Sequence, residues 1–125
     1  MNIPTHLKYT KTDEWFDPGT GAMGLSDYAQ GQLSDIVFVE ILVSVGDAVA
    51  PGKAIASVES VKAAAESYAA TRGKVTAVNE QLSGSPELLN KDPYGAGWMI
   101  KVTGGKAEGL MNAAEYENYC EGRAH

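Results

Sequence analysis

Cysteine and histidine are scarce in this sequence of 125 residues, which has one cysteine, Cys120, and two histidines near its two ends. A single cysteine excludes an internal disulfide and argues against a cysteine-rich metal site. The histidines show neither HxxxH nor HExxH spacing, so the sequence predicts no zinc hydrolase and no metal ligands. It also lacks a long apolar run and a basic segment followed by an apolar one, which predicts no membrane span and no targeting peptide.

Positive charge is limited too: the sequence has ten Lys and Arg residues against sixteen Asp and Glu residues, which gives a net charge of −6. Nucleic acids and anionic membranes need positive charge on their partner, so we expect neither as a partner. An acidic surface suits docking onto basic patches of other proteins, although solubility explains it equally well. The initiating Met makes a complete cytoplasmic gene product the default expectation, or a mitochondrial matrix protein if the chain is a processed eukaryotic form.

Glycine and proline recur along the whole chain, a pattern that favours many short strands. Strands are expected at 7–16, 22–25, 36–43, 53–59, 66–70, 74–79 and 98–103. Ser26 is expected to cap a short helix, and Ser85 to cap a brief helical turn with Pro86 at its first position. Asn112 and Glu115 predict a capping box at the start of a C-terminal helix, about 112–121.

Two segments, VEILVSVGDAVAPGKAI (39–55) and AAESYAATRGKVTAV (64–78), loosely resemble each other. We interpret them as two similar half-sheets wrapped on each other. The sequence therefore predicts one domain over 1–125, mainly β: a flattened barrel-sandwich hybrid of two small antiparallel sheets with short helices and a C-terminal helix.

The stretch VESVKAAAE (58–66) places Lys62 at or beside the tip of the hairpin formed by 53–59 and 66–70. Most lysines are simply solvated. A catalytic amine needs a lowered pKa, but Glu59 and Glu66 nearby in the sequence would favour the charged ammonium. The third interpretation is a modification site, because an enzyme can reach a lysine at a tight turn and acylate it.

The motif VESVKAA resembles the lipoylation site of the H proteins of the glycine cleavage system. Biotin carriers usually place methionines on both sides of the lysine, and lipoyl domains of 2-oxoacid dehydrogenases usually read Asp-Lys-Ala. Val61 fits neither pattern. The resemblance covers nearly the whole chain in the family's order, with LKYTKTDEW (7–15), SDYAQGQLSDIVFVE (26–40), VGDAV (45–49), GKVTAVNEQL (73–82), PELLNKDPYGAGW (86–98) and AAEYENYC (113–120).

The resemblance implies a lipoyl-domain-like carrier protein that is not itself an enzyme, with lipoic acid in amide linkage on Lys62. The implied partners are glycine decarboxylase, aminomethyltransferase, dihydrolipoamide dehydrogenase and the lipoylating enzymes. The arm would carry the aminomethyl group of glycine between them and fold into a surface cleft that protects it. By family position, Thr12, Glu14 and Glu66 are the expected cleft residues, because carboxylates hold an ammonium by charge-assisted hydrogen bonds. Trp15, Trp98, Tyr28 and Tyr94 are expected to serve packing instead.

Some positions depart from the family's pattern. Asp13 stands where a His usually precedes Glu-Trp, VEILVSVGD is one residue longer than usual and lacks a proline, and YAATRG (68–73) replaces a Ser-Pro turn. None of these changes touches Lys62. They leave open a carrier of the same fold that serves another pathway, such as sulfur oxidation or lipoate relay, and an unlipoylated binding module that keeps only the fold.

Overall fold

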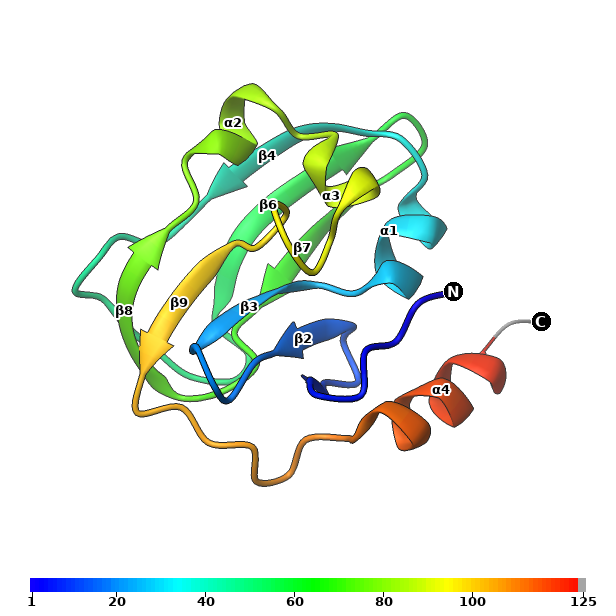
Figure 1. The fold of residues 1–125 in the computed structure, drawn as a ribbon. Coiled ribbons are helices and arrows are strands. Elements are labelled where there is room, and N and C mark those ends of the chain that lie inside the picture. Colours follow the sequence, from blue (N-terminus) through cyan, green and yellow to red (C-terminus); the bar gives the residue numbers. More distant parts are fainter. Residues whose placement is uncertain (124–125) are drawn as a thin grey trace.

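The computed structural model describes residues 1–123 and has two antiparallel sheets with short helices around them (Figure 1). The larger sheet has six strands in the order β1-β2-β3-β9-β8-β5, and the smaller has three in the order β4-β6-β7. The mainly β class with two antiparallel sheets is confirmed. The strands are β1 (Lys8–Tyr9), β2 (Glu14–Phe16), β3 (Ala22–Leu25), β4 (Ile36–Ile41), β5 (Ala48–Val49), β6 (Ala54–Ser60), β7 (Ala64–Tyr68), β8 (Gly73–Val78) and β9 (Ile100–Thr103).

The two similar segments do not form separate half-sheets, so that interpretation was wrong. Each segment crosses between the two sheets: residues 39–55 pass from β4 in the three-stranded sheet through β5 in the six-stranded one and back to β6, and residues 64–78 pass from β7 to β8. Each segment therefore helps to join the two sheets. The reason is geometric, since the glycine-containing turn within each segment lies between strands of different sheets.

The main core contains side chains from both sheets, including Met23 on β3, Val58 on β6 and Ile100 on β9, all fully buried. Burying an aliphatic side chain of this size contributes roughly 1.5–3 kcal/mol relative to leaving it in water. Residues of β6 contact the core from Ile55 to Val58, while their neighbours on β4 and β7 hold the strand from either side. The hairpin that carries Lys62, formed by β6 and β7, therefore extends from a strand whose residues lie in the core.

Four helices surround the sheets within residues 1–123: α1 (Asp27–Leu33), α2 (Gln81–Gly84), α3 (Leu88–Lys91) and α4 (Ala113–Glu121). The Ser26 hydroxyl accepts from the Ala29 N–H at 3.2 Å, so the predicted cap of α1 is confirmed. Asn112 and Glu115 form the predicted capping box at the start of α4, with both bonds at 2.9 Å.

The predicted cap of the short helix near residue 85 was wrong. Helix α3 begins at Leu88, its N-cap is Glu87, and no side chain caps it. Ser85 and Pro86 instead form a preceding turn, in which the Ser85 carbonyl accepts from the Leu88 N–H at 3.1 Å. Pro86 therefore lies in the turn before α3 and not at the first position of the helix.

The expected strand at 7–16 is interrupted. A turn from Thr10 to Asp13 separates β1 from β2, with the Asp13 N–H donating to the Thr10 carbonyl at 3.2 Å. Asp13 has a φ of 74°, a left-handed conformation that aspartate tolerates better than most residues. The polar alternation of this segment concealed the turn.

Helix α4 closes the open side of the larger sheet with a second, aromatic cluster. Tyr116 stacks flat on Tyr9 with ring centroids 4.6 Å apart, and Cys120 is buried one turn further along. Ala113, Tyr116 and Cys120 follow the spacing of one helix face. Within residues 1–123, no helix has both the length and the apolar character needed to cross a membrane.

Candidate functional site

Lys62 lies in the turn that joins β6 to β7, and its side chain is exposed. Ser60 organises this turn: its N–H donates to the Ala63 carbonyl at 2.8 Å, and its hydroxyl accepts from the N–H groups of Ala63 at 3.0 Å and Lys62 at 3.2 Å. The Val61 N–H donates to the Asp35 carbonyl at 3.0 Å, which ties the tip to the segment before β4 (Figure 1). The backbone of the lysine is thus held in place while its side chain extends into solvent.

Glu14, the first residue of β2, is fully buried. One carboxyl oxygen accepts from the Thr10 hydroxyl at 2.8 Å and from the Thr12 hydroxyl, and the other accepts from the Tyr68 N–H at 3.1 Å. Burial raises the pKa of Glu14 from its ordinary value of 4.5 to about 7; these hydrogen bonds lower it and the charge of Asp13 raises it further. Near neutral pH this carboxyl can therefore be switched between its neutral and ionised forms.

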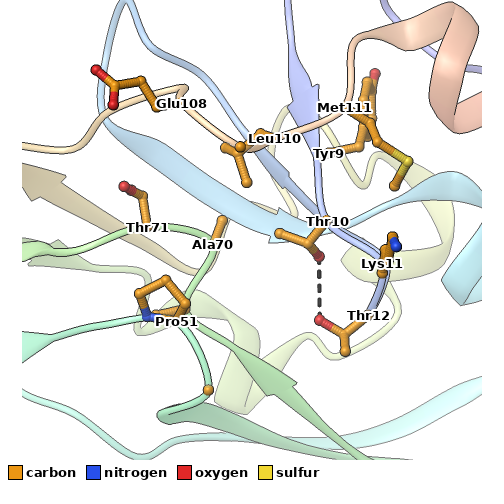
Figure 2. Close-up of a pocket in the computed structure, with 13 residues that line it drawn as sticks. Tyr9, Thr10, Lys11, Thr12, Pro51, Ala70, Thr71, Glu108, Leu110 and Met111 are labelled. Carbon is orange, nitrogen blue, oxygen red and sulfur yellow. Dashed lines mark hydrogen bonds between the residues drawn. The ribbon is translucent and has the colours of Figure 1, made fainter.

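A cleft of about 430 Å³ is lined by Thr10 and Thr12, whose hydroxyls hydrogen-bond to the Glu14 carboxyl (Figure 2). Thr10 and Thr12 stand on one side with their hydroxyl oxygens 3.2 Å apart, and Pro51 and Ala70 come from the loops facing them. The remaining wall is formed by Glu108–Met111, in the segment between β9 and α4. The cleft thus combines an apolar lining with two hydroxyls that reach a buried carboxyl. Its lining residues are Tyr9, Thr10, Lys11, Thr12, Pro51, Gly52, Ala69, Ala70, Thr71, Glu108, Gly109, Leu110 and Met111.

The structure brings two of the expected cleft residues, Thr12 and Glu14, into direct contact. Glu66 lies on the neighbouring β7, two residues before Tyr68, and its side chain is exposed. Lys62 lies in the turn before Ala64, the first residue of β7, whereas Tyr68, whose N–H contacts Glu14, is the last residue of that strand. Lys62 and the buried carboxyl therefore lie towards opposite ends of β7.

Thr10 belongs to the same hydrogen-bonded group but was not predicted. Besides donating to the Glu14 carboxyl, its hydroxyl accepts from the Glu14 N–H at 3.0 Å. The signal in the sequence is the uninterrupted polar run from Thr10 to Glu14, which is typical of a turn whose side chains bond one another.

The aromatic residues expected to serve packing lie outside the cleft lining. Trp15 is buried and its indole N–H donates to the Pro93 carbonyl at 3.0 Å, while Tyr94 packs edge-on against it with centroids 5.9 Å apart. The Tyr94 hydroxyl accepts from the Asp27 N–H and donates to the Asn2 carbonyl. Trp98 and Tyr28 pack against the same cluster, half-buried. None of these four aromatic residues lines the cleft; they pack in this second cluster and form the contacts named above.

The site has the design of a carrier protein: a small rigid β domain presents one lysine at a hairpin tip. Within residues 1–123, no three His, Cys, Asp or Glu side chains gather as metal ligands would. The chain belongs to the glycine cleavage H-protein family, whose model matches residues 7–123.

Relatives named glycine cleavage system H protein span the whole chain. The one from Alteromonas mediterranea is 52% identical, with 94% of this chain and 95% of the relative covered. The one from Nitratidesulfovibrio vulgaris is 47% identical, with both chains fully covered. The crystal structure of a glycine cleavage system H protein from Mycobacterium marinum superposes with a TM-score of 0.82 at 30% identity and covers 98% of this chain and 100% of that one.

Proposed function

We propose that this protein is the lipoyl carrier of a glycine cleavage system, with lipoic acid in amide linkage on Lys62. The observation that carries the proposal is the hairpin tip, where the Ser60 hydroxyl fixes the turn and leaves the lysine exposed. Acylation removes the charge of the amine, and the turn does not depend on that charge because the Ser60 hydroxyl holds it. The family and its full-length relatives support the same role.

When bound, the lipoyl group supplies a disulfide that can be opened to accept the aminomethyl group of glycine and closed again by oxidation. The chain's own contribution is to hold the root of the arm and to receive its far end. An amine at that end is cationic at neutral pH and needs a counter-charge when it leaves water.

We infer that the Glu14 carboxyl supplies this counter-charge through the Thr12 hydroxyl that lines the cleft, and that the exposed Glu66 adds to it from β7. Glu14 is fully buried, so a cation reaches it through the hydroxyls of Thr10 and Thr12. A nearby cation lowers the pKa of a carboxyl, so docking of the amine favours the ionised form of Glu14. The Leu110 and Met111 side of the cleft would cover the apolar part of the arm.

The surface around the tip suits contacts with other proteins. Val37, Phe38 and Val61 are apolar yet 55%, 45% and 67% exposed, and the acidic residues Asp35 and Glu59 adjoin them. We infer that glycine decarboxylase, aminomethyltransferase, dihydrolipoamide dehydrogenase and the lipoylating enzymes approach from this side, each with basic residues around an apolar contact. The bacterial relatives support a cytoplasmic location.

The test is the intact mass of the protein purified from cells that lipoylate their other carriers. We expect one lipoyl increment on the wild type, none on Lys62→Arg, and the full increment on the control Lys53→Arg, which changes an exposed lysine at the base of the same hairpin. Glycine cleavage reconstituted with the partner enzymes should fail only with Lys62→Arg. An unmodified wild type would refute the carrier role.

A further inference from the structure

Tyr116 of α4 and Arg123, two residues beyond the end of that helix, both contact the turn between β1 and β2. The Arg123 guanidinium forms a two-point ion pair with the Asp13 carboxylate, at 2.6 and 2.9 Å, and the Tyr116 hydroxyl donates to the same carboxylate at 2.8 Å. Asp13 is the residue with left-handed backbone in that turn. A paired carboxylate thus anchors the most strained position of the turn to the helix.

Arg123 is itself held in a fixed place. Its guanidinium lies over the rings of Tyr28 and Tyr119, 4.8 and 4.7 Å from their centroids. The Tyr119 hydroxyl donates to the Lys11 carbonyl at 2.8 Å, so α4 contacts the turn at a second point. A planar guanidinium that stacks on rings and forms a two-point pair is more rigid than a surface ion pair of ordinary kind.

The turn from Thr10 to Asp13 carries the two threonine hydroxyls that hydrogen-bond to the Glu14 carboxyl. The Asp13 N–H donates to the Thr10 carbonyl and the Thr10 N–H to the Glu14 carbonyl, so movement of Asp13 shifts both hydroxyl donors. We propose that Arg123 and Asp13 are positioning residues that hold Thr10 and Thr12 against the Glu14 carboxyl and thereby set how long the cleft retains a cationic arm end.

This inference rests on the proposed function of the cleft and adds to it the part played by α4. In the family's usual pattern a His stands at the place of Asp13, and a His could not form this carboxylate ion pair with Arg123. The contact joins positions 110 residues apart in the sequence.

The pKa of Glu14 gives the proposal a signature, because the charge of Asp13 and the hydrogen bonds from the threonine hydroxyls shift it in opposite directions. Glu14 is faced by Thr10, Thr12 and Asp13 from its own turn and by the Tyr68 N–H from β7. Asp13 is contacted by the Tyr116 hydroxyl of α4 and by Arg123, which follows that helix, and Cys120 of α4 lies near both. Loss of the Asp13 charge alone lowers the pKa of Glu14, whereas release of the two hydroxyls raises it, because their hydrogen bonds favour the ionised form. Loss of the guanidinium leaves the Asp13 charge uncompensated and also raises the pKa of Glu14.

The first measurement is a carbon NMR titration of the Glu14 carboxyl on unlipoylated protein, which does not depend on the arm. We expect the midpoint to rise in Arg123→Ala and also in Asp13→Asn, which keeps the left-handed turn but weakens its pairing with Arg123 and so releases the hydroxyls. Arg123→Lys should lie near the wild type, and Lys91→Ala removes one exposed positive charge on α3 as a control. A midpoint that falls in Asp13→Asn, as loss of its charge alone would cause, or that moves in neither variant, would overturn the proposal.

The second measurement is the half-life of the aminomethyl-loaded, lipoylated protein at pH 7.5, beside its thermal stability. We expect a several-fold shorter half-life in Arg123→Ala and in Asp13→Asn, partial rescue by Arg123→Lys, and no change in Lys91→Ala. Wild-type half-lives in both variants would refute the positioning role. If Glu14→Ala also kept the wild-type half-life, the proposed cleft would fail as well, so the two failures are distinguishable.

Discussion

Replacing Glu14 by glutamine should change the pH dependence of stability and, at alkaline pH, make the protein more stable. The neutral carboxyl accepts from the Tyr68 N–H with one oxygen and faces the Thr10 and Thr12 hydroxyls with the other. A glutamine amide has the same shape, accepts from the same N–H and donates to the hydroxyls. The Glu14→Gln protein therefore imitates the protonated wild type at every pH.

The magnitude follows from the two pKa values. The pKa of Glu14 is raised from 4.5 to about 7 in the folded protein. Between these values the folded state holds a proton that the unfolded state has released, so the free energy of unfolding falls as pH rises. Below pH 4.5 this contribution is fully present, and above pH 7 it is lost. A difference of about 2.5 units corresponds to about 3 kcal/mol.

The assay is urea unfolding followed by tryptophan fluorescence at several pH values from 4.5 to 8.5. We expect wild type and Glu14→Gln to agree within about 1 kcal/mol at pH 4.5, and the variant to gain up to about 3 kcal/mol at pH 8.5. Glu66→Gln is the control for loss of one carboxyl, because Glu66 is exposed on β7. A difference between wild type and Glu14→Gln that does not vary with pH would refute the reasoning. The same variant should lose retention of the aminomethyl group, a stability gain at the expense of function.

Further predictions concern the helix cap, a close backbone contact and the docking surface. Asn112→Ala removes the capping box of α4 and should cost about 1 kcal/mol in a thermal melt; an unchanged midpoint would contradict that role. Gly21→Ala should destabilise by more than about 1 kcal/mol, because Gly21 has a φ of 80° and a Cβ there would overlap the Val102 carbonyl oxygen; a wild-type melt would contradict the contact. Phe38→Ser should lower the unfolding free energy by roughly 1–2 kcal/mol, because Phe38 is only 45% exposed, and should slow aminomethyl transfer with partner enzymes; unchanged rates with every partner would exclude Phe38 from docking.

Local signals in the sequence predicted much of the architecture. Ser26 and Asn112 act as caps because a side-chain oxygen satisfies N–H groups two or three residues away. The residues of β4, β6 and β7 pair as antiparallel neighbours across short turns, and the tip carries Lys62. Such features depend on contacts within a few residues, which a sequence shows directly.

Other features were missed or wrongly predicted. The turn from Thr10 to Asp13 interrupted an expected strand, and Ser85 did not cap a helix. The left-handed Asp13 has its carboxylate partners, Arg123 and Tyr116, near the far end of the chain. Secondary-structure propensity depends on neighbouring residues, so it cannot account for partners this far away in the sequence.

The sequence by itself determined the β class, the hairpin, the lysine at its tip and the family to which these belong, because each depends on local pattern and residue order. Only the tertiary structure decided that Glu14 is buried, that Thr10 joins Thr12 in holding it, and that Arg123 steadies their turn. The pKa of Glu14 depends on how much water the surrounding elements exclude and on which charges they bring close. That information exists only once strands and helices distant in the chain have packed together.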